Sequence, residues 1–210
     1  MKIWDIENNF YLYSKKYRLT KAILHYELFK KIIKIPGDVV ECGVFKGVSL
    51  IRFLTFRDFL KSKKKIYGFD VFGSFPFSSK KRDVNFAINH DKFIGKGFSV
   101  KKIYDVLKKK KFKNFSLIKG NIENNLPFFL KKFRNKKISF LHLDLDIYSA
   151  TKISLEVLFP RVSRGGIVLI DDYGKVYGAT KATNEFLKKY KNVKLETLKL
   201  NDSLKFIIKT

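Results

Sequence analysis

FLHLDLDIY, at residues 140–148, is the stretch of sequence that decides the fold. An apolar run leads there into two carboxylates, Asp144 and Asp146, and GGIVLIDDY at residues 165–173 repeats the pattern. Both runs are typical of buried strands in a parallel sheet. Because ligands bind at the carboxyl ends of the strands in an open α/β sheet, the two runs predict three or four carboxylates in one crevice.

The second run ends in Asp171 and Asp172, so the predicted crevice is crowded with negative charge. Converging carboxylates repel one another and raise each other's pKa. A divalent cation that prefers oxygen ligands, such as Mg²⁺ or Ca²⁺, relieves that repulsion. The residues alone leave a second interpretation open, in which the aspartate pair only caps a helix or lies in a solvated loop.

A glycine turn is predicted upstream, in GDVVECGVFKGVS at residues 37–49. The pattern predicts a buried strand, a turn at Gly43 and Gly47, and a helix that begins near Val48. The glycines let the backbone approach a ligand, and the helix start offers free N–H groups. The spacing acid-x-Gly-x-x-x-Gly matches neither the dinucleotide fingerprint nor the P-loop.

A further strand that ends in an acid is predicted in KIYGFD, at residues 65–70. An acid about 20 residues beyond a glycine loop is where the ribose hydroxyls of a nucleotide are usually held. Asp70 has that position, although a helix cap or turn is the alternative for this residue alone. The occurrence of the acidic strand ends and the glycine turn in this order carries more weight than any one of them.

Four segments, taken in order, resemble the class I S-adenosylmethionine-dependent methyltransferases, specifically the macrocin O-methyltransferase-like group. They are PGDVVECGVFKG (36–47), GFDVFGSFP (68–76), DLDIY (144–148) and DDYG (171–174), the last followed by Gly178 and Ala179. The resemblance covers about residues 20–190. It implies Mg²⁺-dependent methylation of a sugar hydroxyl on a nucleotide sugar, glycan or glycosylated metabolite. It also implies a Rossmann-like α/β fold with a seven-stranded, mostly parallel sheet and a C-terminal antiparallel hairpin.

The same resemblance assigns roles to individual residues. The implied metal ligands are Asp144, Asp171 and Asp172, and Asp144 is also the implied general base. The implied cofactor contacts follow the predicted strand ends: Glu41, Gly43, Gly47 and Ser49 at the methionine end, Asp70 at the ribose, and Gly120, Asn121 and Ile122 at the adenine. Asp146 is expected to orient its neighbours. The expected cofactors are S-adenosylmethionine and Mg²⁺.

Length and composition predict one main domain of 210 residues with 45% hydrophobic content. We expect an N-terminal helical lid or cap at residues 1–35 and a methyltransferase domain at residues 36–210. The single Cys42 excludes an internal disulfide framework. No run of 18 apolar residues and no signal peptide are found, so a cytoplasmic protein without a membrane span is expected.

The net charge of +26 comes almost entirely from lysine. Specific nucleic-acid recognition relies on arginine, so no specific nucleic acid is expected as a partner. A positive surface would attract an anionic small-molecule or glycan acceptor. Two other functions stay open: methylation of a catechol-like or RNA acceptor, and a basic nucleic-acid-binding module with a degenerate fold. The short segment before the first strand leaves room for a second subunit, and hence a homo-oligomer.

Hydrophobic periodicity predicts alternating strands and helices. The predicted strands are 38–43, 65–70, 115–119, 138–144, 166–171, 193–199 and 203–208. The predicted helices are 21–34, 47–61, 99–110, 124–133, 150–158 and 179–190. Residues 71–98 are predicted to be irregular and to act as a lid or binding loop. His142 is expected to be structural, whereas His25 and His90 receive no role.

Overall fold

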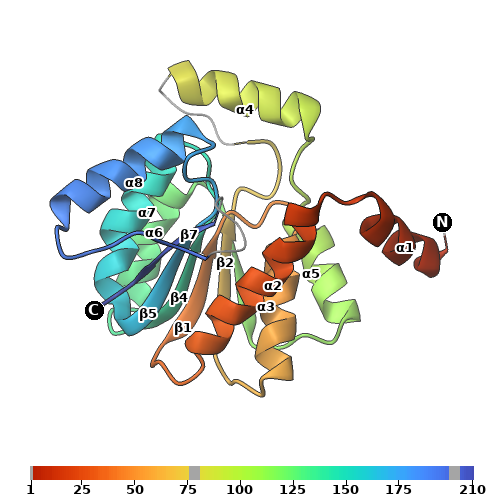
Figure 1. Cartoon of the computed structure of the whole chain (residues 1–210), viewed down its shortest axis with the longest axis horizontal. Helices are drawn as coiled ribbons and strands as arrows, with labels where there is room; N and C mark the ends of the chain where they lie inside the picture. The colour runs from red at the N-terminus through yellow and green to blue at the C-terminus, as the bar shows by residue number, and fades with distance from the viewer. Residues whose placement is uncertain (1, 76–80, 199–203) are drawn as a thin grey trace.

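A seven-stranded sheet forms the centre of the molecule (Figure 1). The computed structural model describes residues 2–75, 81–198 and 204–210. Across the sheet the order is β3-β2-β1-β4-β5-β7-β6. The strands are β1 (Asp38–Cys42), β2 (Ile66–Asp70), β3 (Phe115–Lys119), β4 (Ile138–Leu143), β5 (Val162–Ile170), β6 (Glu196–Thr197) and β7 (Lys205–Ile208).

Strands β1 to β5 pair in parallel, whereas β7 is antiparallel to both of its neighbours. The chain therefore passes through five parallel strands and closes with an antiparallel hairpin. This topology confirms the predicted Rossmann-like fold of the class I methyltransferases. It also places β4 next to β5, so the two acidic strand ends are neighbours.

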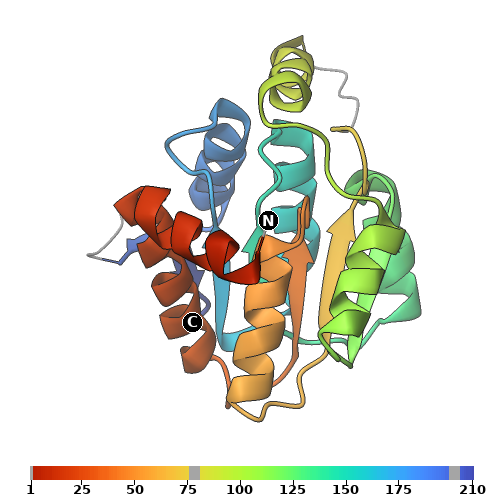
Figure 2. The same ribbon diagram turned by 90° about the vertical axis from the view of Figure 1, so that its right-hand side faces the viewer.

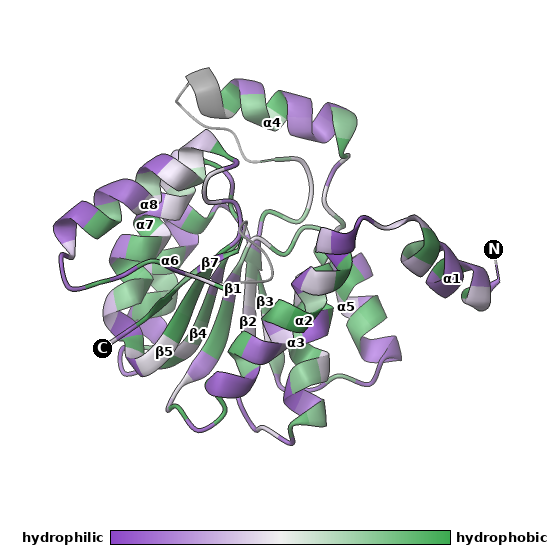
Figure 3. Ribbon diagram, viewed as in Figure 1, coloured by the Kyte–Doolittle hydropathy of each residue, from purple (hydrophilic) through white to green (hydrophobic). Residues whose placement is uncertain are grey.

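Helices cover both faces of the sheet, as Figures 1 and 2 show. They are α1 (Ile3–Tyr13), α2 (Lys16–Lys31), α3 (Val48–Phe59), α4 (Lys81–Phe93), α5 (Val100–Lys109), α6 (Ile122–Lys132), α7 (Tyr148–Leu158) and α8 (Tyr177–Lys189). Helices α2, α3 and α5 pack on one face, and α6, α7 and α8 on the other. Figure 3 shows the hydrophobic strands between the two helical layers.

The two faces of each central strand supply two separate cores, because side chains alternate along a strand. Val39 and Phe140 belong to the core under α2 and α3, whereas Val40 and Leu141 belong to the core under α7. All four are buried. Burial on both faces explains why the sequence of these strands is apolar without interruption.

The stretch 71–98 differs from the prediction, because it contains helix α4. The glycines and Pro76 that suggested an irregular stretch all lie outside that helix, and residues 81–93 contain neither glycine nor proline. Figures 1 and 2 show α4 above the carboxyl edge of the sheet. The predicted turn at Asn201 and Asp202 lies outside the described residues.

The N-terminal segment forms two helices, of which one buries side chains in the core and the other does not. Helix α2 begins earlier than predicted, at Lys16, and buries Leu24, Leu28 and Phe29 in the core. Helix α1 has no buried residue, and its Trp4 side chain is 73% exposed. Within the described residues, no helix has the length and apolar character that crossing a bilayer requires.

One close approach of two strand ends shapes the site. Gly43 follows β1 with a φ of +95°, and a Cβ there would lie 1.9 Å from the carbonyl oxygen of Asp144. Any larger residue would push the two strand ends apart. Gly43 therefore serves the packing of Asp144 as well as the turn.

Candidate active site

A cavity of about 290 Å³ opens at the carboxyl ends of the central strands. Seven predicted site residues line it: Gly43, Ser49, Asp70, Gly120, Asn121, Ile122 and Asp144. Four do not: Glu41, Gly47, Asp171 and Asp172. Asp171 and Asp172 nevertheless adjoin the cavity, because each has a carboxylate oxygen within 4.8 Å of one on Asp144.

Gly47 supports the glycine turn from behind. It precedes α3 in the left-handed conformation, with a φ of +83°. A Cβ at this position would lie 2.9 Å from Cδ1 of Ile103 on α5. The second glycine thus lets α5 pack against the turn, and the first residues of α3 present their N–H groups.

Asp70 holds the glycine turn by hydrogen bonds. Its Oδ2 accepts from the backbone N–H groups of Val44 and Phe45, at 2.9 and 2.8 Å. Its Oδ1 accepts from the N–H of Phe72 at 2.6 Å. Asp70 thus fixes the turn. It also lines the cavity, where it faces the position predicted for the ribose.

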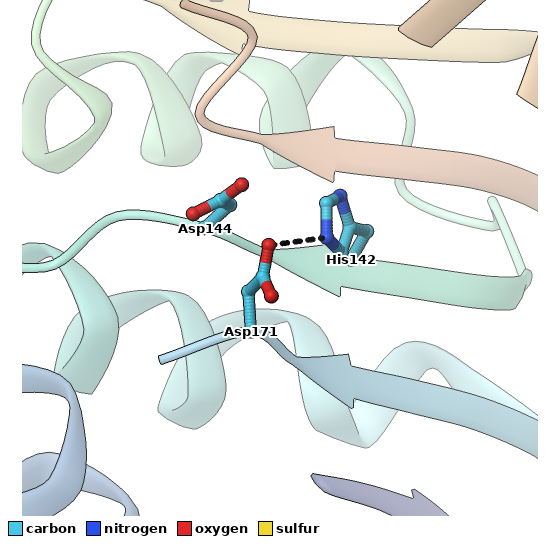
Figure 4. A group of neighbouring side chains, drawn as sticks. All are labelled: His142, Asp144 and Asp171. Atoms are coloured by element: carbon cyan, nitrogen blue, oxygen red, sulfur yellow. Dashed lines mark ion pairs between the residues drawn. The ribbon is translucent and has the colours of Figure 1, made fainter. Parts of the chain in front are cut away.

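The acids at the ends of β4 and β5 form two overlapping groups. In the first, His142, Asp144 and Asp171 have ligand atoms within 4.8 Å of one another (Figure 4). In the second, Asp144, Asp146 and Asp172 meet the same limit. Asp144 belongs to both groups and also lines the cavity, so it is the centre of the cluster.

The two groups differ in how their negative charge is compensated. Burial, and after it the charge of Asp171, raises the pKa of Asp144 well above its usual range. Burial and the charge of Asp172 do the same for Asp146. Burial also favours a raised pKa at Asp171, but hydrogen bonding to His142 and the charge of Lys21 outweigh it and hold that pKa well below the usual range.

Two buried histidines lie behind the cluster. His142 Nδ1 lies 3.1 Å from Glu41 Oε1, and its Nε2 lies 3.9 Å from Asp171 Oδ2 (Figure 4). Burial favours a lower pKa at His142, but these two carboxylates raise it above the ordinary value. The His25 ring meets that of His142 at 5.4 Å, and the pKa of His25 is lowered by burial and then by His142. Glu41, predicted to contact the cofactor, is fully buried behind the cavity instead of lining it.

Three basic residues at the site were not predicted. Lys21 on α2 forms a part-buried ion pair with Asp171. Arg18, one turn earlier on α2, and Arg52 on α3 line the same cavity. The available signal was the spacing of 18, 21 and 25, which places three nitrogen-bearing side chains on one face of a helix.

Helix α4 contributes the cavity wall above the sheet. His90 and Asp91 line the cavity, and Asp91 accepts hydrogen bonds from the backbone N–H of Phe75. The segment after α4 is tied to the glycine turn, because the N–H of Phe98 donates to the carbonyl of Phe45 at 3.1 Å. The position of α4 suits the predicted role as a lid, which stays a prediction.

Comparison of the chain with known proteins relates it to one family. A family model described as macrocin O-methyltransferase (TylF) matches residues 24–204. Demethyldecarbamoylnovobiocin O-methyltransferase of Streptomyces niveus is 25% identical over 163 residues, which are 74% of this chain and 60% of that protein. A tetracenomycin 4'-O-methyltransferase of Streptomyces olivaceus, named for a dimethoxy-rhamnosyl substrate, is 27% identical over 144 residues, 66% of this chain and 54% of that protein. The chain thus spans little more than half the length of these curated relatives.

Two solved structures share the fold. The O-methyltransferase NovP superimposes with a TM-score of 0.79 at 21% identity, over 90% of this chain and 79% of that one. The calicheamicin methyltransferase CalS11 gives a TM-score of 0.74 at 21% identity, over 99% of this chain and 86% of that one.

Proposed function

The chain belongs to the macrocin O-methyltransferase family, and we propose that it is an S-adenosylmethionine-dependent O-methyltransferase that acts on a sugar hydroxyl. The observation that carries the proposal is the position of Asp144, which lines the cavity beside the glycine turn and is the centre of the acidic cluster. The names of the two curated relatives support O-methylation, and the rhamnosyl group in one of them supports a sugar acceptor.

The donor site is proposed to follow the ends of β1, β2 and β3. Gly43 and Ser49 would contact the methionine end, Asp70 the ribose, and Asn121 and Ile122 the adenine. S-adenosylmethionine, when bound, supplies a methyl group on a sulfonium that an acceptor oxygen can attack in line. Fixing the two reactants in line can contribute up to about 7–11 kcal/mol.

Asp144 is proposed to be the general base. Asp144 would take up the hydroxyl proton on a carboxylate oxygen, and the bound donor would supply the methyl group to the acceptor oxygen. Burial raises the pKa of Asp144, which makes the carboxylate a stronger base, and the charge of Lys21 favours its ionised form. A proton acceptor of this kind contributes roughly 10²–10⁴ in rate.

The carboxylates of the second group fit a hard divalent cation. Asp144, Asp146 and Asp172 offer oxygens within 4.8 Å of one another. The raised pKa of Asp144, caused by burial and by neighbouring carboxylates, marks negative charge that Lys21 does not fully compensate. Mg²⁺ prefers such ligands and, when bound, lowers the pKa of a hydroxyl that it contacts.

The metal ligands implied by the resemblance therefore differ in whether a cation already compensates their charge. We propose that Asp144 and Asp172 would hold Mg²⁺ together with Asp146, the residue expected from the sequence only to orient its neighbours. Asp171, the third ligand implied by the resemblance, is already paired with the Lys21 ammonium. Its charge is therefore already compensated, and we place it outside the proposed set of ligands.

A methyl-donor assay tests the proposed function. The protein is incubated with S-adenosylmethionine and a panel of sugar acceptors, nucleotide sugars included, with Mg²⁺ or with excess chelator. We expect methylation of at least one acceptor, loss of turnover in chelator and recovery when Mg²⁺ is restored. Equal turnover in chelator would refute the metal assignment, and no binding of S-adenosylhomocysteine at millimolar concentration would refute the methyltransferase proposal itself.

A further inference from the structure

Two guanidinium groups line the cavity without a carboxylate partner. Arg18 is exposed at the start of α2, and Arg52 is half-buried on α3. In residues 2–75, 81–198 and 204–210, neither arginine forms an ion pair with Asp or Glu. A cation in a partly closed cavity loses hydration without gaining a counter-ion, which is unfavourable.

The two lysines that line the cavity already have partners. Lys21 is paired with Asp171. Lys46 Nζ donates to the carbonyl oxygen of Ile94 at 3.0 Å. The arginines are therefore the cations of the described cavity wall that are left to bind an anion, whereas Asp144 and Asp146 present negative charge there.

The two arginines also act on each other. Burial lowers the pKa of Arg52; the charge of Asp171 opposes that effect, and the positive charge of Arg18 adds to it. Like charges that share a wall of low polarity repel, and an anion between them relieves the repulsion. The planar guanidinium donates two parallel hydrogen bonds to a phosphate, so two such groups suit a phosphate better than two lysines would.

The position of the pair indicates which reactant would carry the anion. Lys21 lies one helical turn beyond Arg18 and contacts Asp171, which follows β5. The residues proposed for the adenosine, Asp70 and Asn121, follow β2 and β3, on the other side of β1 and β4 in the sheet. An anion held by the arginines would thus lie on the acceptor side of the cavity.

We propose that Arg18 and Arg52 bind the phosphate of a phosphate-bearing acceptor, a sugar joined to a nucleoside diphosphate. This inference rests on the proposed function and names its substrate class. It places methylation before the group transfer that consumes an activated sugar, since that transfer removes the phosphate. The donor's methionine carboxylate is the competing anion, and the experiment separates the two.

The experiment measures anion binding without turnover. Inorganic pyrophosphate is titrated by calorimetry into the wild type and into Arg18→Gln and Arg52→Gln at physiological salt, and S-adenosylhomocysteine is titrated in parallel. Arg164→Gln is the matched control, because it removes the same charge from an exposed site near the amino end of β5. Arg52→Lys keeps the positive charge but not the parallel donors of the guanidinium group. It replaces Arg52→Gln in the titration if that variant does not fold.

We expect each glutamine variant to weaken pyrophosphate binding at least about tenfold, as for the loss of a hydrogen bond to a charged group. Arg164→Gln and the affinity for S-adenosylhomocysteine should not change. Equal weakening by Arg164→Gln would reduce the effect to overall charge and overturn the proposal. A parallel loss of S-adenosylhomocysteine affinity would assign the arginines to the donor carboxylate and overturn it too, as would unchanged pyrophosphate binding. Failure of S-adenosylhomocysteine to bind even the wild type would instead count against the proposed function.

In turnover, the wild type should prefer a nucleoside-diphosphate sugar over the same sugar as a simple glycoside. Arg18→Gln should raise KM for the phosphorylated acceptor at least about tenfold, with little change in kcat, because the phosphate lies away from the reacting hydroxyl. An unchanged KM would contradict the proposal.

Discussion

Asp70 and Asp144 occupy equivalent places in the sequence, each at the end of an apolar strand, but the structure surrounds them differently. Asp70 accepts hydrogen bonds from three backbone N–H groups. Asp144 is packed among Asp171, Asp172 and Asp146. A strand-end acid that is satisfied by backbone donors stabilises a turn, whereas one packed against other acids keeps its charge available for a cation or a proton.

The largest expected effect is a loss of activity on substitution of Asp144. Asp144→Asn should lower kcat by roughly 10²–10⁴ or more, because it removes the proton acceptor. Binding of S-adenosylhomocysteine, measured by calorimetry, should stay near that of the wild type. Activity within tenfold of the wild type would remove Asp144 from the chemistry.

The same variant should not lose stability. The folded pKa of Asp144 is raised by burial and by Asp171, so the native state binds more protons than the unfolded state and stability falls as pH rises from the ordinary carboxyl range through the raised pKa. Asparagine removes that loss. The stability of Asp144→Asn relative to the wild type should therefore increase with pH over this interval in urea unfolding.

Asp70 should show the opposite pattern, with a loss of stability. Asp70→Ala leaves three backbone N–H groups without their acceptor, and we expect about 2–4 kcal/mol of destabilisation. Asp70→Asn keeps one oxygen acceptor and should cost less. The affinity for the methyl donor should also fall, because the variant removes the hydrogen bonds that hold the glycine turn. If Asp70→Ala unfolds at the same urea concentration as the wild type, the proposed difference between the two acids is wrong.

Lys21 tests the acidic cluster through its ion pair with Asp171. Lys21→Met should destabilise by about 2–4 kcal/mol, because it leaves Asp171 buried without its cation. Burial favours a lower pKa at Lys21, but Asp171 raises it above the usual value. The stabilising contribution of Lys21 is therefore present at neutral pH and is lost as pH rises through the raised pKa. The deficit of the variant should shrink there, and a deficit independent of pH would exclude the ion pair as its cause.

A smaller effect is expected at α4, the wall that the two acids share. Phe93 is 76% exposed and offers a chymotrypsin site, while His90 and Asp91 line the cavity. Donor product and acceptor together should slow cleavage after Phe93 severalfold, because ordering of the cavity wall suppresses local opening. An unchanged cleavage rate would make α4 a passive insertion.

The sheet and the strand-end acids could be predicted from sequence, because both follow from local patterns. Continuous apolar strands followed by aspartates locate Asp70, Asp144 and Asp171 at one edge. The partners of these acids could not be predicted, because they come from distant parts of the chain. Lys21 and Asp171 are 150 residues apart, and two of the three backbone donors to Asp70 are 25 and 26 residues away.

Helix α4 and the site arginines were missed for a related reason. The glycines flanking residues 81–93 are a strong turn signal, while the helix itself has only ordinary propensity. Arg18 and Arg52 are two of seven arginines in a chain with 45 basic residues, and the one available signal, the helical spacing of residues 18, 21 and 25, does not include Arg52. Only the packing of α2 beside α3 brings them to one cavity.

Cation binding to matched variants tests the central claim most directly, namely that the acids after β4 and β5 hold a divalent ion and the acid after β2 does not. Mn²⁺, a spectroscopic substitute for Mg²⁺, is titrated into the wild type, Asp172→Asn and Asp70→Asn and followed by electron paramagnetic resonance. We predict one bound ion in the wild type, its loss in Asp172→Asn, and its retention in Asp70→Asn. Equal binding by Asp172→Asn and the wild type, or loss of the ion in Asp70→Asn alone, would contradict the account.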